Sequence, residues 1–161
     1  RPATVCGYSQ RTRLDVIVNI LTNHAYNKRK IIINGGNQKR PNIHIQDMVN
    51  AYLEILNQQN EFVNEEIFNV GFENYTLDEI GELVKEKIGD DIVIDHQPTN
   101  DNRSYHISSN KIIKQLGFSP QYSIEKAIED LKQAFEKKLL SNSFDNPKYF
   151  NIKMMQEINL Q

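Results

Sequence analysis

Short β-branched runs alternate with longer amphipathic stretches along this chain. Ile31 to Ile33, stopped by Asn34-Gly35-Gly36, predicts a buried strand that ends in a turn. Pro2 to Val5 and Ile92 to Ile94 predict two further strands, and Glu66 to Gly71 predicts another that is closed by glycine. Strands that alternate with helices indicate an α/β fold.

Two of the amphipathic stretches begin at aspartates. From Asp15 the apolar residues recur at helical spacing, so we expect a helix that is capped by Asp15 and ends near Lys28. Asp47 can cap a second helix in the same way. The stripe that this second helix should bury consists of Met48, Ala51, Tyr52, Ile55 and Leu56.

Two later helices carry sharper boundary signals. Thr76 to Glu79 has the capping-box pattern, in which a hydroxyl and a carboxylate each satisfy a backbone N–H. The helix that it opens should end at Gly89. Ser123 caps the longest helix of the prediction, whose apolar face runs from Ile124 to Leu139.

Composition and charge restrict the class of protein. With 161 residues, of which 39% are hydrophobic and 25% charged, we expect one globular domain over residues 1–161, with 141–161 as a packed C-terminal extension. The net charge of −2 offers no broad basic field, so we expect no nucleic-acid partner and no membrane partner. No window reaches the apolar run of about 20 residues that a membrane span requires. The single cysteine fits the reducing cytoplasm.

The segment from Gly35 to Leu56 carries the most chemistry. It sets a glycine pair, Arg40, a short apolar alternation and an amphipathic helix in fixed order. A guanidinium on a turn at the mouth of a strand suits a bidentate grip on phosphate oxygens. The alternative for Arg40 is a solvated basic turn beside Lys39. His44 lies within the alternation and predicts a structural histidine with a hydrogen-bond partner rather than a metal ligand.

Ordered motifs cover the chain from residue 1 to about residue 140. They are Arg1-Pro2-Ala3-Thr4-Val5-Cys6-Gly7, Arg40-Pro41-Asn42-Ile43-His44-Ile45-Gln46-Asp47, Phe68-Asn69-Val70-Gly71, Arg103-Ser104-Tyr105 with Lys111, and Leu116-Gly117-Phe118. This order resembles the extended short-chain dehydrogenase/reductase family, specifically the NAD-dependent nucleotide-sugar epimerases and dehydratases. The resemblance corresponds to the C-terminal half of that family. It implies the C-terminal part of a Rossmann-like fold, with a small mixed sheet and helices.

Two hallmarks of the family do not occur here in their usual context. They are the glycine-rich turn that binds the NAD pyrophosphate and a tyrosine and lysine four apart on a long helix. The pairs with the tyrosine-to-lysine spacing are Tyr26/Lys30, Tyr122/Lys126 and Tyr149/Lys153. None follows a strand with an upstream serine or threonine, so we assign no catalytic residue. The chain also starts without methionine, and we expect the NAD-binding half to lie elsewhere.

The resemblance implies roles for three residues around the diphosphate of a nucleotide sugar. Arg40 matches the arginine that holds the diphosphate. Arg103 lies in the loop where the family places a second phosphate-directed arginine, although Gln97 stands where an arginine often precedes the loop proline. Asp101 matches an acidic position that meets the nucleotide ribose in some members, and its alternative is an ordinary turn residue.

Four more residues match substrate-contacting positions of the family. Arg13 and Asp15 stand at the start of the first helix, and the helix cap is the alternative role for Asp15. Ile33 and Asn34 would lie along the base of the nucleotide, which backbone groups would contact. The side chains therefore do not distinguish uridine from thymidine, cytidine or guanosine.

The resemblance also implies a cofactor. Val5, Cys6 and Gly7 match the strand end that passes the nicotinamide of NAD or NADP, where close backbone approach favours glycine. Cys6 replaces an aromatic residue that is common there, and its alternative role is that of a small buried hydrophobe.

The chain is thus interpreted as the substrate-binding part of an NAD-dependent nucleotide-sugar epimerase or dehydratase that is catalytically incomplete alone. The alternative is a non-catalytic domain that binds nucleotide diphosphates or another protein. The identity of the sugar, the choice between epimerase, dehydratase and reductase, the choice between NAD and NADP, and a homodimer stay open. An isolated strand at Pro2 to Val5 would leave an edge to pair, so we expect an assembly partner, a swapped arrangement or an incomplete chain.

Overall fold

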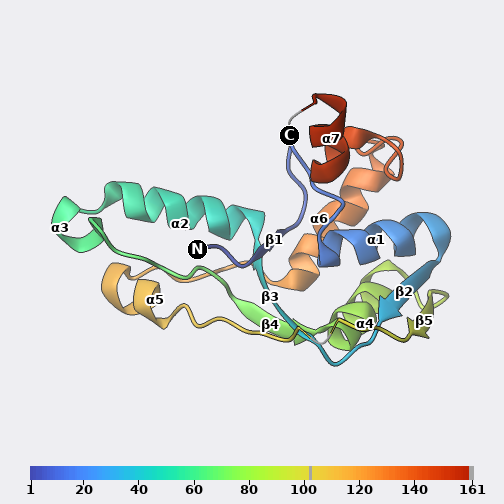
Figure 1. Ribbon diagram of the computed structural model, residues 1–161, viewed down its shortest axis with the longest axis horizontal. Helices are drawn as coiled ribbons and strands as arrows, with labels where there is room; N and C mark the ends of the chain where they lie inside the picture. Colours follow the sequence, from blue (N-terminus) through green and yellow to red (C-terminus); the bar gives the residue numbers. More distant parts are fainter. Residues whose placement is uncertain (102, 160–161) are drawn as a thin grey trace.

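The computed structural model describes residues 1–101 and 103–159, and strands alternate with helices along it (Figure 1). The strands are β1 (Thr4–Cys6), β2 (Lys30–Asn34), β3 (Lys39–His44), β4 (Glu73–Thr76) and β5 (Val93–Gln97). The helices are α1 (Ile17–Lys28), α2 (Ile45–Asn57), α3 (Asn60–Val63), α4 (Leu77–Ile88), α5 (Asn110–Leu116), α6 (Ile124–Glu136), η1 (Pro147–Tyr149) and α7 (Asn151–Glu157). The predicted α/β fold is therefore confirmed. In these residues no helix combines the length and apolar character needed to cross a bilayer.

Two small sheets organise the chain. In the first, β1 runs parallel to β3, with Val5 opposite Ile43, and β4 runs antiparallel to β3, with Tyr75 opposite Arg40. In the second, β2 and β5 are parallel. The strand order of the first sheet is β1-β3-β4, so β1 is an edge strand.

The strand predicted at Glu66 to Gly71 is wrong. Only Val70 pairs there, as an isolated bridge to Pro2, with the Ala3 N–H donating to the Val70 carbonyl at 2.7 Å. The strand that forms is β4, which begins two residues after Gly71. Its sequence, Glu-Asn-Tyr-Thr, has no alternation of apolar and polar residues, so its pairing with β3 rather than its own pattern makes it a strand.

Asp15 does not cap α1. The N-cap is Val16, whose side chain makes no capping hydrogen bond. The Asp15 carboxylate instead accepts from the backbone N–H of Asn151 and from Nε of Arg13, both at 2.8 Å. It therefore joins the C-terminal extension to the start of α1. The predicted helix end at Lys28 is confirmed, because Arg29 takes the left-handed conformation.

Asp47 does not cap α2 either. The N-cap is His44, whose Nδ1 accepts from the Gln46 N–H at 3.1 Å. Asp47 is fully buried and its carboxylate accepts from the backbone N–H groups of Gln121 and Tyr122. In the sequence, an aspartate near the first turn of a helix resembles an N-cap. Here its carboxylate accepts instead from backbone N–H groups of the segment before α6, which is distant in the sequence.

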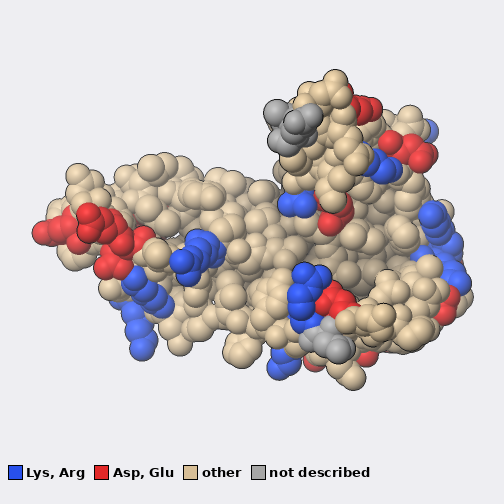
Figure 2. Space-filling model, in the orientation of Figure 1, with Lys and Arg blue, Asp and Glu red and all other residues tan. Residues whose placement is uncertain are grey.

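The buried stripe predicted for α2 is only half right. Met48 and Ala51 are buried, whereas Tyr52 is 56% and Leu56 78% exposed. Figure 1 shows α2 extending away from α1, α4 and α6, so its outer part has no covering layer among the described elements. The surface over α2 is largely uncharged in Figure 2.

The capping signals of α4 and α6 are confirmed. In α4 the Glu79 carboxylate accepts from the Thr76 N–H at 2.7 Å while the Thr76 hydroxyl accepts from the Glu79 N–H at 3.2 Å, and the helix ends at Gly89. The Ser123 hydroxyl caps α6. However, α6 ends before Leu139, which is half exposed, and it is no longer than α2, since each has 13 residues.

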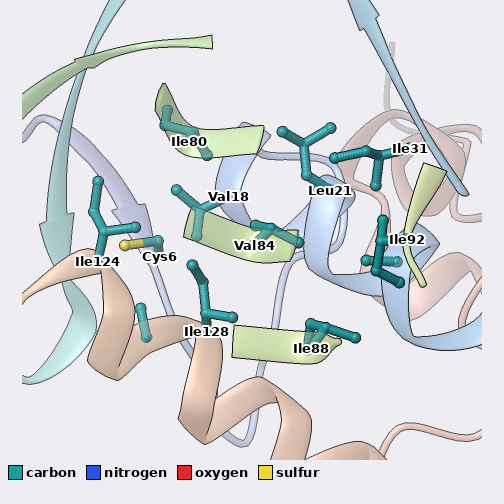
Figure 3. Packing of buried hydrophobic residues seen from close by; sticks show 12 residues of the cluster. Cys6, Val18, Leu21, Ile31, Ile80, Val84, Ile88, Ile92, Ile124 and Ile128 are labelled. Atoms are coloured by element: carbon teal, nitrogen blue, oxygen red, sulfur yellow. The ribbon is translucent and has the colours of Figure 1, made fainter. Parts of the chain in front are cut away.

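The main core lies where α1, α4 and α6 meet (Figure 3). Val18 and Leu21 of α1 face Ile80 and Val84 of α4, and Ile128 of α6 closes the cluster. Each such side chain stabilises the fold by about 1.5–3 kcal/mol when it leaves water. This packing fixes the ends of β1 and β2, from which the candidate site is built.

The C-terminal extension packs against the rest of the fold in its first part, through Tyr149 and Phe150, whereas α7 has no buried residue. Tyr149 is buried in a cluster with Leu14, Leu131 and Phe135. The backbone of Leu14 also donates to the Tyr149 carbonyl at 2.9 Å. The last two residues of the predicted extension, 160–161, lie outside the described residues.

Candidate functional site

Arg40 lies at the start of β3 with its side chain only 15% exposed. Its Nη1 donates to the carbonyls of Lys39 at 3.0 Å and Arg103 at 2.5 Å. The guanidinium also lies over the Tyr105 ring, 5.4 Å from its centroid, where a cation–π attraction operates. Arg40 is therefore a fixed, largely covered cation rather than a solvated residue of a basic turn.

Asp101 joins the two arginines of the predicted clamp. Arg103 grips it with both ends of its fork, Nε to Oδ1 and Nη2 to Oδ2, each at 2.8 Å. Nη2 of Arg40 lies 3.6 Å from the same Oδ2. The Arg103 guanidinium, supported by the Arg103 N–H and by Arg40, holds the pKa of the Asp101 carboxyl well below its usual range. The structure thus brings Arg40, Asp101 and Arg103 into one cluster.

A buried glutamine, which the sequence analysis did not identify, connects this cluster to the turn after β2. Oε1 of Gln38 accepts from the Gly36 N–H at 2.7 Å, and its Nε2 donates to the Asp101 carbonyl at 2.9 Å. Beside it is a hollow of about 520 Å³, lined by Gly35, Gly36, Asn37, Gln38, Pro98, Thr99 and Ser104. The signal in the sequence was a polar residue two positions after a glycine pair, which is too common to identify a functional residue.

The two residues predicted to lie along a nucleotide base occupy the end of β2 beside this hollow. The side chain of Ile33 is buried in the core, against Gly81 of α4. Asn34 is exposed, and its carbonyl accepts from Gln38 at 3.4 Å. Ile33 can therefore meet a ligand only through its backbone, while Asn34 has both backbone and side chain at the surface.

A second pocket, of about 310 Å³, lies at the end of β1. Its walls include Val5, Cys6, Gly7, Arg13, Asn19, Met48 and Tyr52. All three residues predicted to contact the cofactor therefore line one pocket, together with Arg13. Asp15 is held beside it through its ion pair with Arg13.

Asn19 of α1 supports this pocket and was not identified from the sequence. Its buried amide accepts from the Gly7 N–H at 3.0 Å and donates to the Arg13 carbonyl at 2.7 Å. Gly7 has φ +99°, and a Cβ on it would lie 3.2 Å from Nε2 of His44. Glycine is therefore required both by the backbone conformation and by the close approach of the histidine ring.

Cys6 is part of the core despite its place in the pocket wall. Its side chain is 1% exposed, and Sγ donates to the Ile43 carbonyl at 3.4 Å. Burial, together with the charge of Glu73, raises the pKa of the Cys6 thiol to about 12. The residue has the environment of a small buried hydrophobe rather than that of a reactive thiol.

His44 has the hydrogen-bond partners that the sequence analysis predicted for a structural histidine. Its Nε2 lies 3.2 Å from Oδ2 of Asp130, its Nδ1 caps α2, and its ring stacks on Tyr122. Residues 1–101 and 103–159 contain no group of three or more histidine, cysteine or acidic side chains that could hold a metal ion.

The three tyrosine and lysine pairs with catalytic spacing have other contacts. Tyr26 stacks on Phe135, whereas Lys30 pairs with Asp95 at 2.8 Å. The other two tyrosines and lysines likewise contact different partners: Tyr122 stacks on His44, Lys126 pairs with Asp130, Tyr149 is buried, and Lys153 lies over Phe150. Within the described part of the chain, no hydrogen bond joins the tyrosine and lysine of any pair.

A model of the NAD dependent epimerase/dehydratase family matches residues 1–71 of this chain. The matched part contains the pocket at the end of β1 and also Gln38 and Arg40. Asp101 and Arg103 lie beyond it.

Solved structures of nucleotide-sugar epimerases and a dehydratase resemble most of the chain. UDP-glucose 4-epimerase from Thermotoga maritima, solved with UDP-glucose, has a TM-score of 0.73 and 25% identity over 86% of this chain and 45% of its own. dTDP-glucose 4,6-dehydratase from Bacillus anthracis, solved with NAD, has a TM-score of 0.73 and 19% identity over 92% of this chain and 46% of its own. UDP-N-acetylglucosamine 4-epimerase from Bacillus cereus has a TM-score of 0.70 and 20% identity, over 84% and 47%.

The chain therefore spans less than half the length of these three solved structures. Its α/β fold, with small sheets and packed helices, is the Rossmann-like fold of epimerases and dehydratases of this kind, and its first 71 residues match the NAD dependent epimerase/dehydratase family.

Proposed function

We propose that this chain is the substrate-binding part of an NAD- or NADP-dependent nucleotide-sugar epimerase or dehydratase, with Arg40 holding the diphosphate. The observation that carries the proposal is the fixed guanidinium of Arg40, which forms one cluster with Asp101 and Arg103. Gln38, which donates to the Asp101 carbonyl, and Ser104, which follows Arg103, line a hollow of about 520 Å³. Planar forks of N–H donors match phosphate oxygens bidentately. In this proposal residues 1–161 form one substrate-binding unit, and the NAD-binding half of the enzyme lies outside them.

Five further residues have places in this proposal. Asn34 and the backbone of Ile33, which directly precede Gly35 in the wall of the hollow, contact the nucleotide base. Arg13, in the pocket at the end of β1, contacts the sugar end of the substrate, while Asp15 positions the Arg13 guanidinium at 2.8 Å. Asp101 orients Arg103 before substrate arrives.

Calorimetry with UDP, dTDP, GDP and CDP tests the role of Arg40. We expect the wild-type chain to bind at least one of them and Arg40→Ala to weaken that binding about 10- to 100-fold, as for a lost charge-assisted hydrogen bond. Lys114→Ala is the matched control, because it removes the same charge from an exposed position on α5. Equal binding by Arg40→Ala and Lys114→Ala, or no binding by the wild type, would contradict the proposal.

The pocket at the end of β1 fits one end of a nicotinamide cofactor. Its volume of about 310 Å³ is at the lower end for ligand sites, and glycine at position 7 lets the backbone approach closely. Val5, Cys6 and Gly7 would hold the nicotinamide there, largely through their backbone. When bound, a nicotinamide supplies a reversible hydride acceptor.

The surface beside this pocket is suited to contact with the NAD-binding half, which we place outside the chain. β1 is an edge strand that runs parallel to β3. Next to it, Tyr52 and Met48 also line a hollow of about 290 Å³ with Ile67 and Phe68. A parallel sheet is normally covered on both faces and continued by further strands. We therefore infer that this half adds a strand to β1 and covers the apolar face of α2.

The proposal also predicts that the chain alone does not turn over. The catalytic proton chemistry of such enzymes needs a tyrosine and lysine that act together, and the described residues contain no such contact. Incubation of the chain with NAD and UDP-glucose or dTDP-glucose should give no 4-epimer and no dehydrated product. Product formation by the chain alone would overturn this part of the proposal. The reading frame upstream of Arg1 is a second test, since it should encode a glycine-rich βαβ unit.

A further inference from the structure

The hydrogen bonds of the two arginines divide them into a fixed and a movable cation. Arg40 is held by two carbonyls and by the Tyr105 ring, and its side chain is 15% exposed. The side chain of Arg103 is 81% exposed, and the Asp101 carboxylate is the acceptor of its guanidinium. Only Arg103 can therefore swing without disturbing packed neighbours.

The carboxylate between them satisfies Arg103 much better than Arg40. Both oxygens of Asp101 accept from Arg103 at 2.8 Å. Nη2 of Arg40 lies 3.6 Å from the nearer oxygen, which is beyond hydrogen-bond distance. Among the described residues, neither Nη2 nor Nε of Arg40 has an acceptor within that distance. An anion with more oxygens could accept from the Nη2 and Nε groups of Arg40, which no described residue engages at that distance.

We propose that Asp101 is an internal stand-in for the diphosphate, which occupies the arginine clamp in the free protein and is displaced when substrate binds. This inference rests on the proposed function of Arg40. The carboxylate neutralises Arg103 and keeps its guanidinium beside Arg40. A diphosphate takes over the donors of Arg103 and engages the free donors of Arg40. Asp101 then sets affinity by competing with the ligand for the same guanidinium groups.

The backbone of the Asp101 loop is held independently of the carboxylate. Gln38 donates to the Asp101 carbonyl at 2.9 Å, the Lys39 N–H donates to the Ser104 hydroxyl at 3.0 Å, and the Tyr105 N–H donates to the Lys39 carbonyl at 3.4 Å. The Arg103 N–H donates to Oδ1 of Asp101 at 3.1 Å, and asparagine can accept that bond. Asp101→Asn therefore removes the charge and leaves the loop in place.

The variant Asp101→Asn tests the proposal with pyrophosphate and with UDP as calorimetric probes. We expect it to bind both about threefold to tenfold more tightly than the wild type, because a partly exposed competing ion pair is lost. Asp91→Asn is the matched control. Asp91 also pairs with an arginine through two hydrogen bonds, to Arg29, and lies at the end of α4 away from the hollow. It should change affinity less than twofold.

The outcomes separate this inference from the proposed function. If Arg40→Ala abolishes binding but Asp101→Asn binds equally or more weakly, Asp101 is a ligand contact or a bystander and only the stand-in role is overturned. If neither wild type nor Asp101→Asn binds either probe, both proposals fail. Pyrophosphate bound without UDP selectivity still supports the stand-in role, because the diphosphate is the shared chemistry.

A spectroscopic readout checks the exchange itself. In the free wild type the Nε–H proton of Arg103 should give a protected NMR signal. Its protection should decrease in Asp101→Asn, because a neutral amide oxygen accepts this bond more weakly than a carboxylate. Saturation with pyrophosphate should move this signal in the wild type. A signal that keeps its position at saturation would show that Arg103 stays on Asp101, which overturns the proposal.

Discussion

The Asp47 carboxylate accepts from the backbone N–H of Gln121 through both of its oxygens, at 2.9 and 3.0 Å. The next N–H, of Tyr122, donates to the same carboxylate at 2.9 Å. Because Asp47 has no exposed surface, these donors replace the water that a carboxylate would otherwise hold. The start of α2 is thereby fixed to the segment that leads into α6.

Asp47→Asn should lower the free energy of unfolding by about 2–4 kcal/mol, since the acceptor charge is lost and an amide N–H group then faces buried donors. Urea denaturation followed by circular dichroism measures the change. Asp90→Asn is the control, because Asp90 is exposed, and it should change stability by less than about 0.5 kcal/mol. Equal small effects of both variants would show that the Asp47 contacts do not contribute to stability.

Glu73 of β4 should make stability decrease as the pH rises. Burial, with the nearby charge of Glu125, raises the pKa of the Glu73 carboxyl above its ordinary value of 4.5, although the Ile124 N–H donates to it at 2.6 Å. The folded chain therefore binds a proton more tightly than the unfolded chain. Stability from this group is complete below about pH 4.5 and is lost as the pH rises through the folded-state pKa.

Glu73→Gln should accordingly be more stable than wild type at pH 7, with a difference that disappears near pH 4. Glutamine still offers the Ile124 N–H an oxygen acceptor. Thermal unfolding at both pH values measures the effect, and Glu61→Gln is the control because Glu61 is exposed on α3. A wild type that exceeds Glu73→Gln in stability at pH 7 would refute the sign.

Local signals in the sequence predicted the starts of α4 and α6, because each cap involves residues only three apart. The capping box of Thr76 and Glu79 needs only its own turn, and it forms as predicted. Asp47 fails for the opposite reason, since its donors are 74 and 75 residues away and no local pattern marks them. The sequence did not predict β4 either, because β4 is a strand through its pairing with β3 and not through its own residue pattern.

The candidate site also has one part that local sequence signals predicted and another that depends on long-range contacts. The local sequence indicated that Arg40 lies at the start of a strand after the turn at Gly35 and Gly36, and β3 begins at Lys39. The partners of its guanidinium did not follow from the sequence, since Arg103 lies 63 residues further along and Asp101 pairs with both arginines. Long-range contacts decide which charges meet, and a single chain without its fold does not reveal them.

Cys6 should resist thiol reagents in the folded chain. Its side chain is 1% exposed and burial raises its pKa to about 12, so the thiolate is scarce and covered. Alkylation by iodoacetamide at pH 8 should be slower than in denaturant by a factor on the order of 100 or more. Labelling of the native protein at the rate of the denatured one would show that the pocket at the end of β1 exposes the sulfur.

The buried and the exposed side of α2 should differ in how strongly a substitution lowers stability. Met48 is 6% exposed and its side chain packs in the buried cluster on the inner side of α2. Met48→Ala should therefore lower the free energy of unfolding by about 2–4 kcal/mol, through lost burial and the cavity left behind.

Leu56 is 78% exposed, and Leu56→Lys should change the free energy of unfolding by less than about 0.5 kcal/mol while it raises solubility. Urea denaturation of both variants at several protein concentrations provides the measurement. A loss above about 1 kcal/mol for Leu56→Lys that grows with protein concentration would mean that the α2 face is already covered by another copy of the chain. If only Met48→Ala lowers the free energy of unfolding, the exposed face of α2 is not covered by another copy of the chain. Contact with an NAD-binding half requires this face to be open.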